Sequence, residues 1–302
     1  MANAFKANQE FDIVVLNSKM STKKIKKLMS EYSGVRFTVG IYDLKEPLIL
    51  RSGQDVMCDE GVVFNRKHGG RMLMSEFGPD TVKYKGTKSA SWLGGRFVAN
   101  TNNKAANVIT LFHACDVLLE DVVVEGCINY HSLELNSCKD IIIKNCKFRN
   151  QTYTGDDDFR EAIQIDFANY DGLKVQDATN TSKCYDGTHC KSIVITDCSF
   201  ENVPNGIGTH TVGPEEKYHT DIAIRFCTFK NIKGRAIKVA GMKDVGIDQI
   251  IDTYLDLYLN SFEKAHLING GTVALQNKRC SKNVTIRVYD KKKEKCVLVK
   301  YV

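Results

Sequence analysis

Ionisable side chains gather on four short segments that share one apolar pattern. The segments are HSLELN (131–136), EAIQID (161–166), NGIGTH (205–210) and RAIKVA (235–240). In each of them the third and fifth residues form an inward pair, which is aliphatic except at Thr209. This alternation with a period of two predicts strands whose remaining side chains point outward. Charged side chains are rarely buried in a core, so a strand with this many of them on one side is expected to present that side for another purpose. The outward face is therefore a candidate functional site.

Alignment of the four segments places their outward residues in three columns. The columns are His131, Glu161, Asn205 and Arg235; Glu134, Gln164, Gly208 and Lys238; and Asn136, Asp166, His210 and Ala240. Neighbouring strands of a sheet lie about 4.8 Å apart, so Asp166 and His210 are within reach of a direct hydrogen bond. Such a pair is suited to acid–base catalysis. His131 and Glu161 stack in the same way, as a second pair or as an ion pair that holds the corner.

The spacing of two carboxylates indicates cleavage of a polymer. Glu134 and Asp166 are offset by one strand and two residues, roughly 8 Å between backbones, which overlaps the carboxylate separation of inverting glycosidases. We predict Asp166 and Glu134 as the catalytic carboxylates. His210 would tune or share the acid–base work, and Glu161 would orient it.

Other residues of the same face are predicted to bind the substrate. Lys238 and Arg235 would neutralise an anionic substrate group or a developing negative charge. His131 and Gln164 lie in the same columns and would add polar contacts. Trp92, in the segment SASWLGGRF, is predicted as a stacking platform for a sugar, and the alternative is a tryptophan of the core.

Two interruptions border the predicted face, at 151–160 and 167–189. Long loops of this kind tend to carry function, and these would wall a groove. The run Asp156, Asp157 and Asp158 is a candidate calcium site, because hard cations take several oxygen ligands, and the alternative is a solvated loop. No other feature of the sequence requires a cofactor.

A repeat predicts the scaffold that positions these residues. CKDIIIKNCKFRN (138–150), CKSIVITDCSFEN (190–202) and HTDIAIRFCTFKN (219–231) superpose, each with alternating apolar residues and a Cys-x-Phe-x-Asn ending. Stacking of such units in parallel buries columns of equivalent side chains. The inward columns are Val122, Cys146, Cys198 and Cys227, then Val124, Phe148, Phe200 and Phe229. The turn column is Gly126, Asn150, Asn202 and Asn231, which we interpret as a structural amide ladder.

The repeat predicts an all-β fold, a single-domain right-handed parallel β-helix with a short N-terminal capping helix. The helix is expected over 21–32, where Ile25, Leu28, Met29 and Tyr32 share one face. We divide the chain into an N-terminal cap with the first strands (1–50) and the parallel β-helix (51–302). The segments VGIDQIIDTYLDLYL and KNVTIRVYD are expected to form degenerate final coils, closed by the lysine-rich tail.

Bulk properties restrict the function further. The chain has 302 residues and a net charge of +6, spread too thinly for a nucleic-acid surface but compatible with an anionic polymer such as a uronic-acid glycan or teichoic acid. Eleven cysteines without a CxxC pair indicate buried thiols. The N-terminus does not read as a signal peptide and no apolar run is long enough to span a membrane. We therefore expect synthesis in the cytoplasm and action at a cell surface as part of a virion tail.

The chain resembles the pectate-lyase-like superfamily of right-handed parallel β-helix proteins. It is most similar to β-helix proteins from tails of phages of Gram-positive bacteria and to related gut-bacterial proteins. The resemblance covers nearly the whole chain and is carried by GIYDLKEPLILRS, WLGGRF, HSLELNSCKDIIIKNCKF, EAIQID, DGTHCKSIVITDCSF, GIGTHT and KYHTDIAIRFCTF. It implies a role directed at glycans without naming a reaction.

A comparison with polygalacturonase-type hydrolases extends the resemblance. Those enzymes carry an acidic pair, a Gly-His-Gly strand and an Arg-Ile-Lys strand on successive coils, and Asp166, His210 and RAIK follow a similar order. The Asn-Thr-Asp-Gly segment of that family and the Trp-Ile-Asp-His strand of pectate lyases are both missing from this sequence. Hydrolysis, elimination and phosphodiester cleavage therefore stay open.

The sequence thus predicts a phage-tail-type protein that binds and cleaves a bacterial surface polysaccharide, as a hydrolase or a lyase. The alternative from another class is a non-catalytic adhesin that uses the same groove to bind a glycan or teichoic acid. A structural spacer is a third alternative. The protein would act as a monomer or as a homotrimer.

Overall fold

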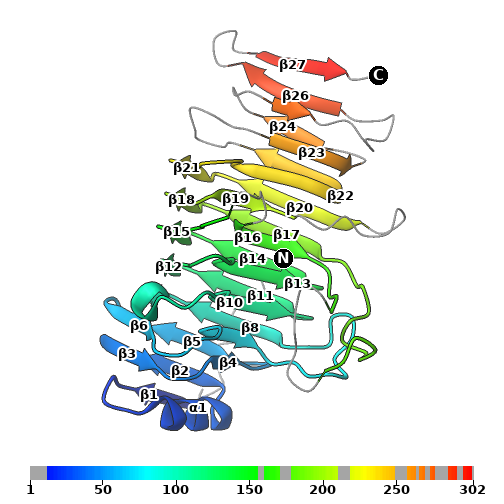
Figure 1. Ribbon diagram of the computed structural model, residues 1–302. Coiled ribbons are helices and arrows are strands. Elements are labelled where there is room, and N and C mark those ends of the chain that lie inside the picture. The colour runs from blue at the N-terminus through cyan, green and yellow to red at the C-terminus, as the bar shows by residue number, and fades with distance from the viewer. Residues whose placement is uncertain are drawn as a thin grey trace.

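The computed structural model describes residues 12–155, 160–170, 178–209 and 218–248, together with five later strands. Those strands are β23 (Leu257–Phe262), β24 (Ala265–Ile268), β25 (Val273–Leu275), β26 (Thr285–Asp290) and β27 (Lys295–Lys300). The described chain winds into successive coils that stack along one axis, as Figure 1 shows from blue at the N-terminal end to yellow.

The coils contribute parallel strands to three faces, which we call A, B and C because the chain passes from A to B to C within a coil. Face A contains β4 (Leu48–Leu50), β7 (Leu73–Ser75), β10 (Ile109–Phe112), β13 (Leu133–Asn136), β16 (Glu161–Asp166), β19 (Asn205–Gly208), the start of β22 (Ile237–Asp248), β23 and β25. Face B contains β1 (Ile13–Leu16), β2 (Gly34–Phe37), β5 (Asp55–Cys58), β8 (Lys88–Leu93), β11 (Cys115–Glu120), β14 (Lys139–Lys144), β17 (Lys191–Thr196), β20 (His219–Arg225), the rest of β22, and β24. Face C contains β3 (Gly40–Leu44), β6 (Val62–Arg66), β9 (Arg96–Val98), β12 (Val123–Glu125), β15 (Lys147–Arg149), β18 (Ser199–Glu201) and β21 (Thr228–Lys230). A short 3-10 helix, η1 (Asn100–Asn102), lies between β9 and β10.

This arrangement is a right-handed parallel β-helix, and the predicted fold class is confirmed. Each coil leaves a hydrophobic interior that only the next coil can cover, so the chain stacks rather than forming separate sheets. The capping helix α1 (Thr22–Glu31) lies at the N-terminal end, beside β1 (Figure 1). Ser21 caps it by accepting a hydrogen bond from the backbone N–H of Lys24 at 3.3 Å. Ile25 and Met29 are buried against the first coils, which covers the end of the solenoid.

The predicted core columns are confirmed by the strand register. Val124, Phe148, Phe200 and Phe229 are direct partners on β12, β15, β18 and β21. The rings of Phe148 and Phe200 stack at 5.2 Å between centroids, and those of Phe200 and Phe229 stack at 4.7 Å. The cysteine column beside them is buried, and each thiol donates to a backbone carbonyl of another strand. The nine cysteines from Cys58 to Cys227 are all free thiols.

The predicted asparagine ladder is present at the corner between faces C and A. Asn231 Nδ2 donates to Asn202 Oδ1 at 3.0 Å, and Asn202 Nδ2 donates to Asn150 Oδ1 at 3.1 Å. All three residues have left-handed backbones, with φ of 55°, 53° and 56° for Asn231, Asn202 and Asn150. Asparagine tolerates this conformation better than other residues that have a Cβ, which explains its repetition at one turn.

The C-terminal strands depart from the prediction of final parallel coils. β22 and β23 pair in parallel, as expected for a coil. β26, within KNVTIRVYD, instead pairs antiparallel with β27, so Tyr289 lies opposite Cys296. A hairpin satisfies the backbone groups of its two strands without a further coil. The prediction of a degenerate coil at this segment is therefore wrong.

No helix within the described ranges is long and apolar enough to cross a membrane.

Candidate active site on face A

The four predicted polar strands are neighbours on face A in the predicted register. Leu133 pairs with Ile163, Ile163 with Ile207, and Ile207 with Ile237, so β13, β16, β19 and β22 follow in order. Glu134, Gln164, Gly208 and Lys238 consequently form one column, and Asn136 and Asp166 are partners in the next. The aliphatic pairs on the inner side hold these strands in place because a shift of one residue would expose them.

The polar side chains of this face are nearly inaccessible, which the sequence did not predict. Glu161 is 0% exposed, Asp166 2% and Glu134 3%. His131, Gln164 and Lys238 are similarly covered. Burial of charged groups is costly unless partners compensate for the lost hydration. The partners that compensate for this burial therefore determine how each side chain of the site is held.

Glu134 is held by donors from the two preceding coils. Its Oε2 accepts from the amide of Asn107 at 2.5 Å and from the hydroxyl of Thr110 at 3.2 Å. Nη2 of Arg71 lies 3.9 Å from the same oxygen, and Nε of Arg71 donates to Thr110 Oγ1 at 2.9 Å. Oε1 makes no hydrogen bond within the described part of the chain, so all of these donors converge on one carboxylate oxygen. The other oxygen takes no part in these contacts.

Asp166 lies at the end of β16, on the coil after Glu134. Its Oδ2 accepts from the side-chain amide of Gln164 at 2.9 Å, and its Oδ1 accepts from the backbone N–H of Phe167 at 2.8 Å. Beside it, Nδ2 of Asn136 is buried and has no hydrogen-bond partner among the described residues. An unsatisfied buried donor is uncommon and marks a place where a polar ligand atom would be stabilising.

A second carboxylate cluster is centred on Glu161. Its Oε1 lies 3.8 Å from Nζ of Lys238, and its Oε2 lies 3.8 Å from Nδ1 of His131. His131 Nδ1 is also 2.8 Å from the backbone oxygen of Glu161. The predicted stacking of His131 on Glu161 is thus confirmed, and Lys238 joins the pair from the far side. Glu161, His131 and Lys238 therefore form one buried cluster of ionisable side chains.

Gly208 makes the contact between Lys238 and Glu161 sterically feasible. β19 lies between the strands that carry these two residues, and Gly208 occupies the outward position in that strand. A Cβ at Gly208 would lie 2.6 Å from the Lys238 backbone oxygen and 2.8 Å from the Lys238 Cβ. The missing side chain therefore leaves room for Lys238 in the column.

Residues 178–189, in the insertion after β16, contact earlier coils. Tyr84 donates its hydroxyl to the backbone oxygen of His189 at 2.9 Å, and Lys83 N donates to Asp186 Oδ2 at 2.7 Å. Cys184 packs with Phe112 and Ala168 in a small separate hydrophobic cluster. These contacts fix residues 178–189 beside the corner between faces A and B, so the predicted insertion borders the site.

Trp92 is not part of a binding surface, and this prediction is corrected. Its side chain is 0% exposed and lies on face B, in β8. The indole contacts the rings of Phe64 and Phe97 at centroid distances of 5.9 and 5.7 Å, and Nε1 donates to the backbone oxygen of Gly94 at 3.1 Å. A tryptophan that fills the core and has its N–H satisfied cannot stack on a sugar at the surface.

Several predicted residues are placed differently or lie elsewhere in the chain. Arg235 is half-buried at the start of the face, where its backbone N–H donates to Asn205 Oδ1 at 2.7 Å. His210 and the candidate calcium ligands Asp156, Asp157 and Asp158 lie outside the described residues. The described ranges contain no cluster of three or more histidine, cysteine or acidic residues arranged to hold a metal.

Arg71, Asn107 and Thr110 were not predicted from the sequence. The segment NVITLF (107–112) precedes HSLELN by one coil and pairs with it, since Thr110 is the direct partner of Glu134. Extension of the strand alignment by one segment toward the N-terminus would have found Asn107 and Thr110. Arg71 lies one coil further toward the N-terminus, before β7, at the position equivalent to Asn107. The inward residue after Leu73 is Ser75, so the aliphatic pair that marks most of these strands is missing and the sequence signal is weaker.

Comparison of the chain with known proteins places it among parallel β-helix proteins at the level of fold. The surface adhesin PfbA of Streptococcus pneumoniae superposes with a TM-score of 0.69 and 16% identity, over 92% of this chain and 80% of the adhesin. ORF18 of Geobacillus virus E2 gives a TM-score of 0.63 and 9% identity over 92% of this chain. The catalytic domain of a GH87 α-1,3-glucanase in complex with nigerose superposes with a TM-score of 0.55 and 9% identity, over 94% of this chain.

These similarities concern architecture. The chain spans 61% of the viral protein and 56% of the glucanase domain. No family model matches the sequence, and no curated protein matches it. The superpositions show a shared right-handed parallel β-helix, as the resemblance implied, and at identities this low they show the fold alone.

Proposed function

We propose that the protein binds and cleaves a bacterial surface polysaccharide at the polar strands of face A. The observation that carries this proposal is the assembly of Glu134, Glu161 and Asp166 on adjacent coils, with cationic partners around two of them. A solenoid gains nothing in stability from buried charges that aliphatic residues could replace. Such clusters are characteristic of sites where charge is needed for chemistry or recognition.

The contacts favour a division of roles among the carboxylates. Glu134 is the proton-transferring group, because its donors occupy only Oε2 and leave Oε1 for the substrate. Asp166 is the second carboxylate, oriented by Gln164 and the Phe167 N–H. Glu161, held between Lys238 and His131, is a positioning residue that maintains the electrostatics of the face.

The setting we propose is the surface of a bacterium, with the protein as a component of a phage tail. The similarity of fold to a viral protein, to a streptococcal surface adhesin and to a glucanase domain supports this setting. A uronic-acid glycan or a teichoic acid is the polymer that suits the net positive charge of the chain.

The test is incubation of the protein with a panel of cell-wall polysaccharides and teichoic acids, with released oligomers measured by mass spectrometry. The parent protein should release shortened products, and Glu134→Gln and Asp166→Asn should not. Glu120→Gln, on face B, is the matched control and should cleave normally. A parallel incubation with a chelator tests the proposed calcium site at Asp156, Asp157 and Asp158.

The second candidate function is glycan binding without cleavage. The burial of Glu134 and Asp166, at 3% and 2% exposed, favours it, because so little of either carboxylate is accessible to a reacting bond. Retention of intact polymer, with no product from the parent protein, would support this candidate and reject catalysis.

A further inference from the structure

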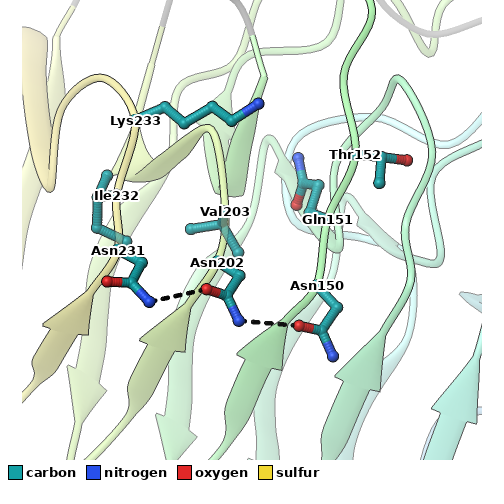
Figure 2. A pocket seen from close by; sticks show the side chains of 8 residues that line it. All are labelled: Asn150, Gln151, Thr152, Asn202, Val203, Asn231, Ile232 and Lys233. Atoms are coloured by element: carbon teal, nitrogen blue, oxygen red, sulfur yellow. Dashed lines mark hydrogen bonds between the residues drawn. The ribbon is translucent and has the colours of Figure 1, made fainter.

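A groove of about 690 Å³ lies at the corner between faces C and A, away from the carboxylate cluster. Figure 2 shows its lining, with the three ladder asparagines in a row on successive coils. The groove is lined by Asn150, Gln151, Thr152, Asn202, Val203, Asn231, Ile232 and Lys233. It therefore extends across three coils and runs along the solenoid axis.

The ladder asparagines still have hydrogen-bonding capacity toward the groove. Each amide has two N–H donors and an oxygen with two lone pairs, and a ladder bond uses one donor of one residue and one lone pair of the next. Asn150, at the end of the ladder, also donates from Nδ2 to Glu125 Oε1 at 3.4 Å. All three asparagines are exposed, so their other hydrogen-bonding groups recur along the groove at intervals of about 4.8 Å. A row of fixed, evenly spaced amides is complementary to a ligand that repeats its own hydroxyl groups.

The charge and polarity of the lining narrow the class of ligand. None of the eight residues is acidic, and Lys233 is the single cation. Val203 is buried and Ile232 is half-buried, which provides an apolar floor beneath the amides. Amides and a hydroxyl beside small apolar patches suit the alternating hydroxyl and C–H surfaces of a sugar chain, whereas a metal ion would need carboxylates.

An exposed aromatic ring lies one coil before the groove. Gln151, which lines the groove, donates from Nε2 to the backbone oxygen of Tyr130 at 2.8 Å and accepts from Ser132 Oγ at 3.0 Å. The Tyr130 side chain is 45% exposed, and the guanidinium of Arg160 lies 5.8 Å from its ring centroid. The Arg160 guanidinium lies over one face of the ring, and the exposed part of the ring provides a surface on which sugar C–H groups can stack.

We propose that this groove is a second polysaccharide-binding site, which holds a polymer along the coil axis through the amide ladder and extends to Tyr130. The identity of the ligand rests on the proposed glycan-directed function, but the site shares no residue with the carboxylate cluster of face A. It serves to retain the polymer while face A acts on it.

The experiment measures retention of immobilised polysaccharide and cleavage of short oligosaccharides by the same set of variants. Thr152→Trp fills the groove from an exposed position, Lys233→Ala removes its cation, and Tyr130→Ala removes the ring. Lys147→Ala and Ile142→Ala are matched controls, an exposed lysine on face C and an exposed apolar residue on face B. Circular dichroism of each variant confirms that it is folded.

The groove variants should weaken polymer retention by about tenfold, the order expected when one central contact of a binding site is lost. They should cleave short oligosaccharides at the parent rate, and the controls should match the parent in both assays. Polymer retention that is unchanged in all three groove variants would overturn this inference. Retention that depends on the groove, with no cleavage of any substrate, would support the groove and reject the proposed catalysis.

Discussion

Lys238 and Glu161 form a buried ion pair across an intervening strand, with 3.8 Å between Nζ and Oε1. The side chains are 8% and 0% exposed, so neither charge is compensated by bulk water. The contact depends on Gly208, the outward residue of β19 between them. The pair thus links three coils on the polar face, and its energetics differ from those of the ion pairs on the solenoid surface.

Replacement of Lys238 by methionine should destabilise the fold, because it leaves the Glu161 carboxylate buried without its cationic partner. Loss of one member of a buried pair typically costs about 3–5 kcal/mol. Urea unfolding of Lys238→Met should show a loss of this order. The double variant Glu161→Gln with Lys238→Met should recover part of that loss, because no uncompensated charge remains.

The control for the Lys238 variants is the exposed pair of Lys230 and Glu201 on face C, with 2.7 Å between Nζ and Oε1. Solvent screens this pair, so Lys230→Met should leave the urea midpoint nearly unchanged. Equal losses for Lys238→Met and Lys230→Met would show that burial does not govern the energetics of the Lys238 pair.

Trp92 should report on the core and not on ligand binding. Truncation of a fully buried aromatic residue costs about 3–5 kcal/mol, so Trp92→Ala should be strongly destabilised in urea unfolding. Trp92 is the only tryptophan of the chain, so intrinsic fluorescence follows this position alone. Its emission should stay unchanged when polysaccharide is added. A ligand-induced shift of the emission would contradict the assignment of Trp92 to the core.

The fold was predictable because parallel stacking repeats the same physical requirement in each coil. Phe148, Phe200 and Phe229 recur at one spacing since each must cover the ring before it. Asn150, Asn202 and Asn231 recur because each turn requires a left-handed residue. The same periodicity gave the register of face A, and hence the neighbours of Glu134 and Glu161.

The parts that escaped prediction lack that periodicity. Arg71 reaches Glu134 from a coil in which Ser75 takes the place of one inward aliphatic residue, so the alignment is weak there. Trp92 carries no sequence signal that separates a buried ring from an exposed one. The burial of face A was also unpredicted, because strand alternation distinguishes inward from outward residues without indicating what covers the outward side. The final hairpin escaped because alternation does not distinguish parallel from antiparallel pairing.

Acidification should destabilise the protein through His219. Burial lowers the pKa of His219 from 6.5 to about 3, with a smaller contribution from His189, whose ring lies 4.8 Å away. The native state keeps this imidazole neutral, whereas the unfolded chain takes up a proton below its ordinary pKa. The free energy of unfolding should therefore fall as the pH drops from about 6.5 toward 3, with a slope approaching about 1.4 kcal/mol per pH unit.

His219→Asn isolates this contribution. Nδ1 of His219 accepts a hydrogen bond from the backbone N–H of Cys190 at 2.9 Å, and an asparagine oxygen is a comparable acceptor that does not titrate. Denaturant unfolding of both proteins between pH 7 and 4.5 should show a shallower pH dependence for the variant. Parallel curves for the two proteins would exclude His219 as a source of the acid sensitivity.

Arg71 should control the activity of Glu134 more than the stability of the fold. Its side chain is 23% exposed, so its removal leaves the core intact, but it links Thr110 Oγ1 to the Glu134 carboxylate. Under the proposed function, Arg71→Ala should lower the rate of polymer cleavage by about tenfold or more, because Glu134 loses a charge-assisted support. Product release measured by mass spectrometry against time gives this rate.

Arg71→Lys should recover only part of the cleavage rate, since an ammonium group lacks the fork with which a guanidinium contacts two acceptors at once. Arg36→Ala is the matched control, because Arg36 forms an ion pair with Asp59 on the exposed surface of face B. That variant should cleave at the parent rate. If Arg71→Ala also cleaves at the parent rate while Glu134→Gln is inactive, Glu134 acts without the help of Arg71, and the donors Asn107 and Thr110 suffice to position it.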